Sequence, residues 1–228
     1  MKKFYPVIHV IDKNQTLRNV DIALIAEADG IFLISHGSLS YKELLILGKE
    51  IKDKYPDLWL GFNFLDISIN QFFTFFNSYQ NYFNSFCDAI WFDDSKRGVN
   101  DKEADIITSL WKKSLFKGKL FGGVAFKYVK QPESLVEAVE SSLGNMSVIT
   151  TSGDGTGLAA RPYKIKMMSE AITDNTSLAI ASGINSKNIN EYLPYTDIFL
   201  VSTGISIDHS NLDLEKAIEL GKLIHQEF

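Results

Sequence analysis

The most restrictive feature of the chain is a run of three strand-loop-helix units between residues 147 and 206. Three short apolar segments in this stretch, rich in Val, Ile and Leu, each end in small hydroxylated residues and glycine. Each is followed by a polar turn and amphipathic residues. Repeated units of this kind pair their strands in parallel and pack their helices on the outside. The stretch therefore predicts a part of a parallel α/β sheet.

The preceding residues supply five more units of the same kind. Ser40 with Glu43 forms a capping-box pattern at one helix start, and Pro132 suits the first turn of another. The apolar segments predict strands over residues 6–11, 30–34, 59–65, 89–92 and 120–126. The predicted helices cover residues 16–28, 40–55, 68–86, 101–115 and 132–143.

Eight units of about 28 residues each account for all 228 residues. The sequence therefore predicts an α/β protein, with residues 1–228 forming a single (β/α)8 TIM barrel domain. An apolar content of 45% is enough for one large core. A doubly wound open sheet is the structural alternative.

The composition argues against several classes of partner. The net charge is −5 and the Lys and Arg residues are scattered, so no nucleic-acid partner is expected. No apolar run is long enough to span a membrane. Pro6, His9 and Asp12 interrupt the N-terminal apolar segment before it could act as a signal peptide. With a single cysteine, Cys87, the chain is predicted to be a cytoplasmic protein.

The turns after the last two predicted strands are suited to binding a phosphate group. Glycine lets backbone amides approach an anion closely, and loops after strands 7 and 8 commonly form the phosphate site of a TIM barrel. The predicted phosphate-binding residues there are Ser182, Gly183, Ser202, Thr203 and Gly204. The run from Val148 to Thr156 superficially matches the phosphate loop of phosphoribosyltransferases, but no acidic pair precedes it.

Three segments carry a family resemblance. They are Thr-Ser-Gly-Asp-Gly-Thr-Gly from residue 151, Ala-Ser-Gly-Ile-Asn-Ser-Lys-Asn-Ile-Asn from 181, and Val-Ser-Thr-Gly-Ile-Ser from 201. Together they resemble the BtpA-like family and, more distantly, phosphoribosylanthranilate isomerase, both of which are ribulose-phosphate-binding barrels. The resemblance implies that the turns at 182–183 and 202–204 hold a substrate phosphate. It also implies that the loop 153–157, with Gly155 and Gly157, closes over that phosphate.

The first half of the chain departs from these families. Asp12-Lys-Asn-Gln stands where BtpA-like proteins carry a segment with proline and glycine. The cysteine that is the general base of phosphoribosylanthranilate isomerases is also missing after the first strand. The isomerase reaction itself is therefore not expected.

Catalytic residues of TIM barrels come from the carboxyl ends of the strands. A carboxylate that moves a proton and an amine that stabilises an oxyanion or forms a Schiff base suit a phosphosugar reaction. The predicted catalytic residues are Asp12, Asp93 and Lys127, and the other predicted mouth residues are His36, Asn63, Asp94 and Asp154. The alternatives are that Asp93 and Asp94 form a solvated turn and that Lys127 is an ordinary exposed lysine.

Neither a cofactor nor a metal ion is expected. His9 and His36 follow neighbouring strands, but two histidines without a ligand spacing are a weak signal for a metal. His209 and His225 have no predicted role.

Aromatic residues fill the helix predicted over residues 68–86. Most fall on one stripe, which core packing against the barrel explains, while Phe73, Phe75 and Tyr82 fall outside it. Aromatic side chains are enriched at subunit interfaces, so the segment 71–86 predicts a homodimer.

Taken together, the patterns predict an enzyme that acts on a phosphosugar or phosphoribosyl compound as an isomerase, a lyase or a glycosyl transferase. The alternative is a sensor or assembly factor of the BtpA-like kind that is not catalytic but keeps the phosphate site.

Overall fold

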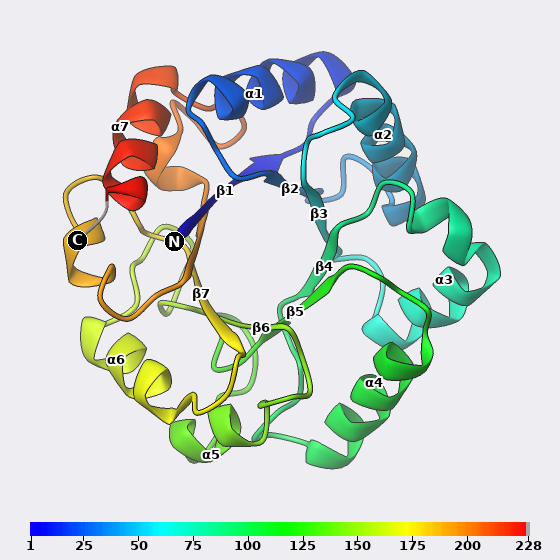
Figure 1. Ribbon diagram of the computed structural model, residues 1–228, viewed down its shortest axis with the longest axis vertical. Helices are drawn as coiled ribbons and strands as arrows, with labels where there is room; N and C mark the ends of the chain where they lie inside the picture. Colours follow the sequence, from blue (N-terminus) through cyan, green and yellow to red (C-terminus); the bar gives the residue numbers. More distant parts are fainter. Residues whose placement is uncertain (227–228) are drawn as a thin grey trace.

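Eight parallel strands close into a barrel in the computed structural model, which describes residues 1–226 (Figure 1). Each strand pairs with its neighbour in sequence, and β8 pairs with β1. The TIM barrel prediction is confirmed, and the open sheet is excluded. The strands are β1 (Lys3–His9), β2 (Ile31–Ile34), β3 (Leu60–Asn63), β4 (Ala89–Phe92), β5 (Lys119–Gly123), β6 (Val148–Ser152), β7 (Ser177–Ala181) and β8 (Ile198–Val201).

The helices form a ring outside the barrel (Figure 1). Ser40 and Glu43 form the predicted capping box at the start of α2, and Ser68 and Gln71 form another at α3. The α-helices within residues 1–226 are α1 (Lys13–Ile25), α2 (Tyr41–Lys54), α3 (Ile69–Phe83), α4 (Asp101–Lys113), α5 (Leu135–Glu140), α6 (Pro162–Ala171) and α7 (Leu214–His225).

Two predicted helices differ from the structure. The segment between β7 and β8 contains a single 3-10 turn, η1 (Ile189–Glu191), in place of an α-helix. A second 3-10 turn, η2 (Thr203–Ile205), follows β8. Helix α5 is short because Ser134, two residues after Pro132, caps its first turn by accepting a hydrogen bond from the amide of Glu137.

The barrel interior is filled by side chains of one parity along each strand, because successive residues of a strand point to opposite faces. Phe32 lies at its centre and makes edge contacts with Tyr5, Trp91 and Phe121. The side chains at the alternate strand positions point outward and pack against the helices in a second, larger apolar layer. The interior is therefore a packed core, and a cavity opens at the carboxyl ends of the strands.

The aromatic residues of α3 are mostly part of the core. Phe72, Phe73 and Phe76 are 0% exposed, although Phe73 was expected outside the buried stripe. Tyr79 is 54% exposed and has non-helical backbone angles, which kink the helix and turn Phe83 toward the core. The aromatic surface left for a partner is thus smaller than the sequence suggests, and homodimerisation through residues 71–86 stays a prediction.

No helix within residues 1–226 combines the length and the apolar character that crossing a membrane requires.

We expect Phe73→Ala to lower the free energy of unfolding by about 3–5 kcal/mol, because it leaves a cavity in a closely packed layer. The exposed Tyr79→Ala variant should change stability by at most about 0.5 kcal/mol. Urea unfolding followed by circular dichroism measures both. Equal losses in the two variants would contradict the assignment of α3 aromatics to the core.

Candidate functional site

A cavity of about 450 Å³ opens at the carboxyl ends of the strands. It is lined by residues from all eight strand ends or the loops that follow them. The lining includes seven of the residues that were predicted from the sequence: His36, Asn63, Asp93, Lys127, Ser182, Ser202 and Thr203. It also includes Trp91, Tyr128 and His209, to which the sequence assigned no role, together with His9 and with Thr156 of the loop 153–157.

Asp93 faces the cavity because every second residue of β4 points into the barrel and Asp93 is the next residue in that series. Ala89 and Trp91 point into the barrel, so Asp93 follows them on the same side, whereas Asp94 does not line the cavity. A Cβ atom on Gly123 would overlap the backbone carbonyl of Asp93. Glycine at the end of β5 therefore lets the Asp93 backbone approach that strand closely.

The Asp93 carboxylate lies in a partly desolvated environment. Asn63 Nδ2 donates a hydrogen bond of 3.0 Å to Asp93 Oδ1. Burial raises the pKa of Asp93, while the Asn63 hydrogen bond and the charge of Lys127 oppose that rise. A carboxyl group with a raised pKa is suited to exchange protons near neutral pH.

Lys127 lies between Asp93 and the turn after β7. Its Nζ donates a hydrogen bond of 2.6 Å to Ser182 Oγ, and its backbone amide donates to Ser152 Oγ at 2.9 Å. Burial lowers the pKa of Lys127, and the nearby charge of Asp93 opposes the effect. The two side chains are thus an interacting acid and base on neighbouring strand ends.

The turns after β7 and β8 contribute Ser182, Ser202 and Thr203 to the cavity lining. Ser182 and Gly183 both have left-handed backbone angles, with φ of 70° and 72°. A Cβ atom on Gly183 would overlap the backbone of Ala159, because the loop after β6 crosses it at van der Waals distance. The amides of Gly183, Thr203 and Gly204 donate no hydrogen bond to the described part of the chain. Backbone amides without a partner can donate to a bound anion.

The loop after β6 is fastened from two sides. Lys164 Nζ donates to the carbonyls of Ala125 and Ser152 at 2.6 and 2.7 Å, and burial lowers its pKa to about 8. On the cavity side, the amide of Thr156 donates to the Tyr128 hydroxyl at 3.0 Å. These contacts place Thr156 on the cavity wall.

Some of the predicted residues do not line the cavity. Asp12 is exposed and accepts a hydrogen bond from the Gln15 amide as the N-cap of α1. Asp94 binds the amide and ammonium groups of Lys96. Asp154 is exposed on the loop after β6. The predicted glycines lie in the surrounding loops and are not part of the lining: Gly155, Gly157, Gly183 and Gly204.

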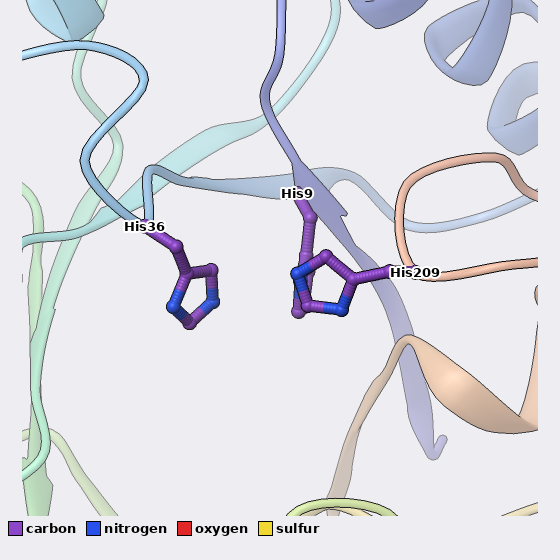
Figure 2. A group of neighbouring side chains, drawn as sticks. All are labelled: His9, His36 and His209. Carbon is purple, nitrogen blue, oxygen red and sulfur yellow. The ribbon is translucent and has the colours of Figure 1, made fainter.

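Three histidines gather at one side of the mouth (Figure 2). His9 Nδ1 lies 3.0 Å from His209 Nε2, and the ring centroids of His9 and His36 are 4.8 Å apart. Burial, with smaller contributions from the neighbouring charges, lowers the pKa of His9 to about 3, so its imidazole is neutral at physiological pH. Alternation after Val7 indicates that His9 faces inward, but no sequence signal places the distant His209 beside it.

Solved structures share this fold over nearly the whole chain. Orotidine 5'-monophosphate decarboxylase from Methanocaldococcus jannaschii has 14% identity and a TM-score of 0.66, with 99% of this chain and 100% of that chain covered. The Pyrococcus horikoshii orotidine 5'-phosphate decarboxylase has 9% identity, a TM-score of 0.67 and coverage of 98% and 100%. Phosphoribosyl anthranilate isomerase from Thermus thermophilus has 11% identity, a TM-score of 0.63 and 96% coverage of both chains.

No family model matches the chain, and comparison with curated proteins finds no match. At these identities the structural similarity shows the fold, and the BtpA-like resemblance stays a prediction.

We expect Asp93→Asn to raise the free energy of unfolding at pH 7 by roughly 1 kcal/mol, because it removes a charge that burial disfavours and keeps the acceptor for Asn63. The folded-state pKa of Asp93 lies above the unfolded-state value. Wild-type stability therefore falls as pH rises through the range between these two pKa values. The gain should therefore disappear at acidic pH.

Chemical denaturation at several pH values measures this difference. Asp94→Asn is the matched control, because it removes an ion pair at the next residue and should not stabilise the protein. A loss of stability in Asp93→Asn at pH 7 would show that the carboxylate is favourably solvated or paired.

Proposed function

We propose that the protein is an enzyme that binds a phosphorylated small molecule, a phosphosugar or a phosphoribosyl compound, in the cavity at the mouth of the barrel. The observation that carries this proposal is the meeting of two features in one cavity. At the ends of β7 and β8, amides that donate no hydrogen bond within residues 1–226 adjoin the lining residues Ser182, Ser202 and Thr203, and the interacting Asp93 and Lys127 line the same cavity. Lys127 connects the two features through its hydrogen bond to Ser182.

The phosphate would lie against the amides of Gly183, Thr203 and Gly204. The hydroxyl groups of Ser182, Ser202 and Thr203 line the same part of the cavity and can donate further hydrogen bonds. The Lys127 ammonium adds a positive charge at this side of the cavity. The loop that contains Gly155 and Gly157 would cover the bound group, with Thr156 at its inner surface.

The rest of the ligand would contact two buried polar atoms that have no partner within residues 1–226. These are Trp91 Nε1, a hydrogen-bond donor, and Asn63 Oδ1, an acceptor, and both residues line the cavity. A buried polar atom without a partner costs free energy, which a ligand hydroxyl or carbonyl group would recover on binding. The Trp91 donor and the Asn63 acceptor thus support a polar, sugar-like ligand.

Asp93 is the proposed proton-transferring group and Lys127 the group that stabilises the developing negative charge. The Lys127 ammonium can stabilise an enolate or alkoxide. Because the pKa of Lys127 is lowered, its neutral amine can also attack a carbonyl carbon to form a Schiff base. Asn63 orients the carboxylate. This set favours isomerase or lyase chemistry, and it does not include Asp12, which caps α1 and is not part of the cavity lining.

The structural neighbours support a phosphate-ester ligand by analogy. By their names, the decarboxylases act on orotidine 5'-monophosphate and the isomerase acts on phosphoribosyl anthranilate. The BtpA-like sensor or assembly factor is the second proposal, since a phosphate site need not be catalytic.

Replacement of Gly157 tests the phosphate site without changing its amides. Gly157 has φ of 76°, and its Cβ position is open, with Thr203 Oγ1 3.9 Å away. Asp and Asn both tolerate this conformation, but Asp places a negative charge beside Thr203. We expect thermal unfolding of the wild type and of Gly157→Asn to shift with a phosphosugar, and that of Gly157→Asp not to shift.

A ligand at 100 times its dissociation constant should stabilise the responsive proteins by about 2.7 kcal/mol. Inorganic phosphate and a panel of phosphosugar and phosphoribosyl compounds serve as probes. Equal shifts in the Asp and Asn variants would place the anion elsewhere.

Measured turnover distinguishes the proposed enzyme from the proposed sensor or assembly factor. With a compound that shifts unfolding, Asp93→Asn and Lys127→Met should lower turnover at least about 100-fold while the ligand still binds. Assays of product formation by nuclear magnetic resonance measure this effect. Binding without turnover in the wild type, for each compound that binds, would favour the sensor.

A further inference from the structure

The histidine cluster is built from three parts of the chain that are far apart in sequence. His9 is the last residue of β1, His36 lies in the loop after β2, and His209 lies in the loop between β8 and α7 (Figure 2). One ring nitrogen from each residue lies within 4.8 Å of the other two. Two nitrogens bound to a tetrahedral Zn²⁺ lie about 3.3 Å apart, so the observed spacing is close to that of a ligand set.

Two buried amide side chains hold the His209 loop against β1. Gln15 and Asn19, from α1, are only 3% and 2% exposed. Gln15 Nε2 donates to the carbonyl of His9 and also to the carbonyl of Ser210, while Asn19 bonds Ser210 and Leu212. Buried amides with several partners fix the backbone around them. His209 is therefore placed beside His9 by its neighbours, even though its own side chain is exposed.

The His36 loop is joined to the same strand end. Ser38 Oγ donates to the carbonyl of Val10, and the Val10 amide donates to Ile34. Ser35 closes the loop by bonding both the amide and the carbonyl of Leu39. Gly37, at φ of 97°, permits the sharp bend directly after His36. Both loops are thus anchored around the end of β1.

We propose that His9, His36 and His209 form a mononuclear site for a divalent transition metal ion of the Zn²⁺ type. Three imidazoles without a carboxylate favour Zn²⁺, Co²⁺, Ni²⁺ or Cu²⁺ over Mg²⁺ and Ca²⁺. The exposed His36 and His209 can adjust their side chains to the ion, whereas His9 is held by the strand.

The site leaves a coordination position open toward the cavity, because all three histidines are part of its lining. Three protein ligands with an open position are the arrangement of catalytic zinc sites. An ion there could accept an oxygen atom of a ligand in the same cavity as Asp93 and Lys127 and polarise it. The metal site does not depend on the proposed phosphate function, and its test needs no substrate.

Metal binding to an untagged, chelator-treated protein tests the proposal. We expect one Zn²⁺ per chain by calorimetry and elemental analysis, and we expect bound Co²⁺ to give the intense visible absorption of a low-coordinate site. His36→Gln and His209→Gln should each weaken Zn²⁺ binding by about 10-fold or more, and the double variant should lose the Co²⁺ absorption.

The fourth histidine is the matched control. His225, the last residue of α7, bonds Asp29 at 2.9 Å and is not part of the cluster, so His225→Gln should bind metal like the wild type. Circular dichroism verifies that each variant is folded. The proposal is overturned if the folded wild type binds no Zn²⁺ at micromolar concentration. It is equally overturned if the double variant binds Zn²⁺ as tightly as the wild type.

Discussion

Closure of the eight-stranded barrel is the constraint on which the rest of the structure depends. Once the strands are paired in parallel and closed, alternation along each strand decides which residues point to the axis. The same alternation that buries Phe32 and Trp91 in the core continues beyond the strand ends and directs Asn63 and Asp93 into the cavity. The site is therefore an extension of the packed interior, where burial raises the pKa of Asp93 and lowers the pKa of Lys127.

Close backbone contacts are the second element of the site. Glycines at the ends of β5 and β7 lack the Cβ atom that would collide with neighbouring loops. These contacts let the loop after β6 cross the turn at Gly183, while Lys164 holds that loop to β5 and β6. The amides of Gly183, Thr203 and Gly204, which donate no hydrogen bond within residues 1–226, consequently lie in the turns that border the cavity.

Much of this architecture could be predicted from local sequence patterns. The apolar segments located all eight strands, and Ser40 with Glu43 marked a helix start to the residue, because both signals are local. The absence of an α-helix between β7 and β8 could not be predicted, since the 3-10 turn there is short and its sequence has helical features. Strand alternation allows only one of the neighbouring Asp93 and Asp94 to face the axis, and the structure shows that it is Asp93.

Long-range contacts explain what the sequence could not show. His209 is 200 residues from His9, and its position depends on buried hydrogen bonds from Gln15 and Asn19 to the loop beside it. Asp12 is an acidic residue that closely follows the first strand, which made it a catalytic candidate. It caps α1 instead, because β1 ends at His9 and the chain has already turned outward. Such assignments require the three-dimensional arrangement of several loops.

The central claim is that amides after β7 and β8 bind a phosphate group next to Lys127. Its most direct measurement is a titration of isotope-labelled protein with a phosphosugar that is followed by amide resonances. We expect saturable shifts that are largest at Gly183, Thr203 and Gly204, together with a shift of the Lys127 side-chain resonance. Shifts confined to other parts of the surface, or none at any of these amides with any phosphorylated compound, would contradict it.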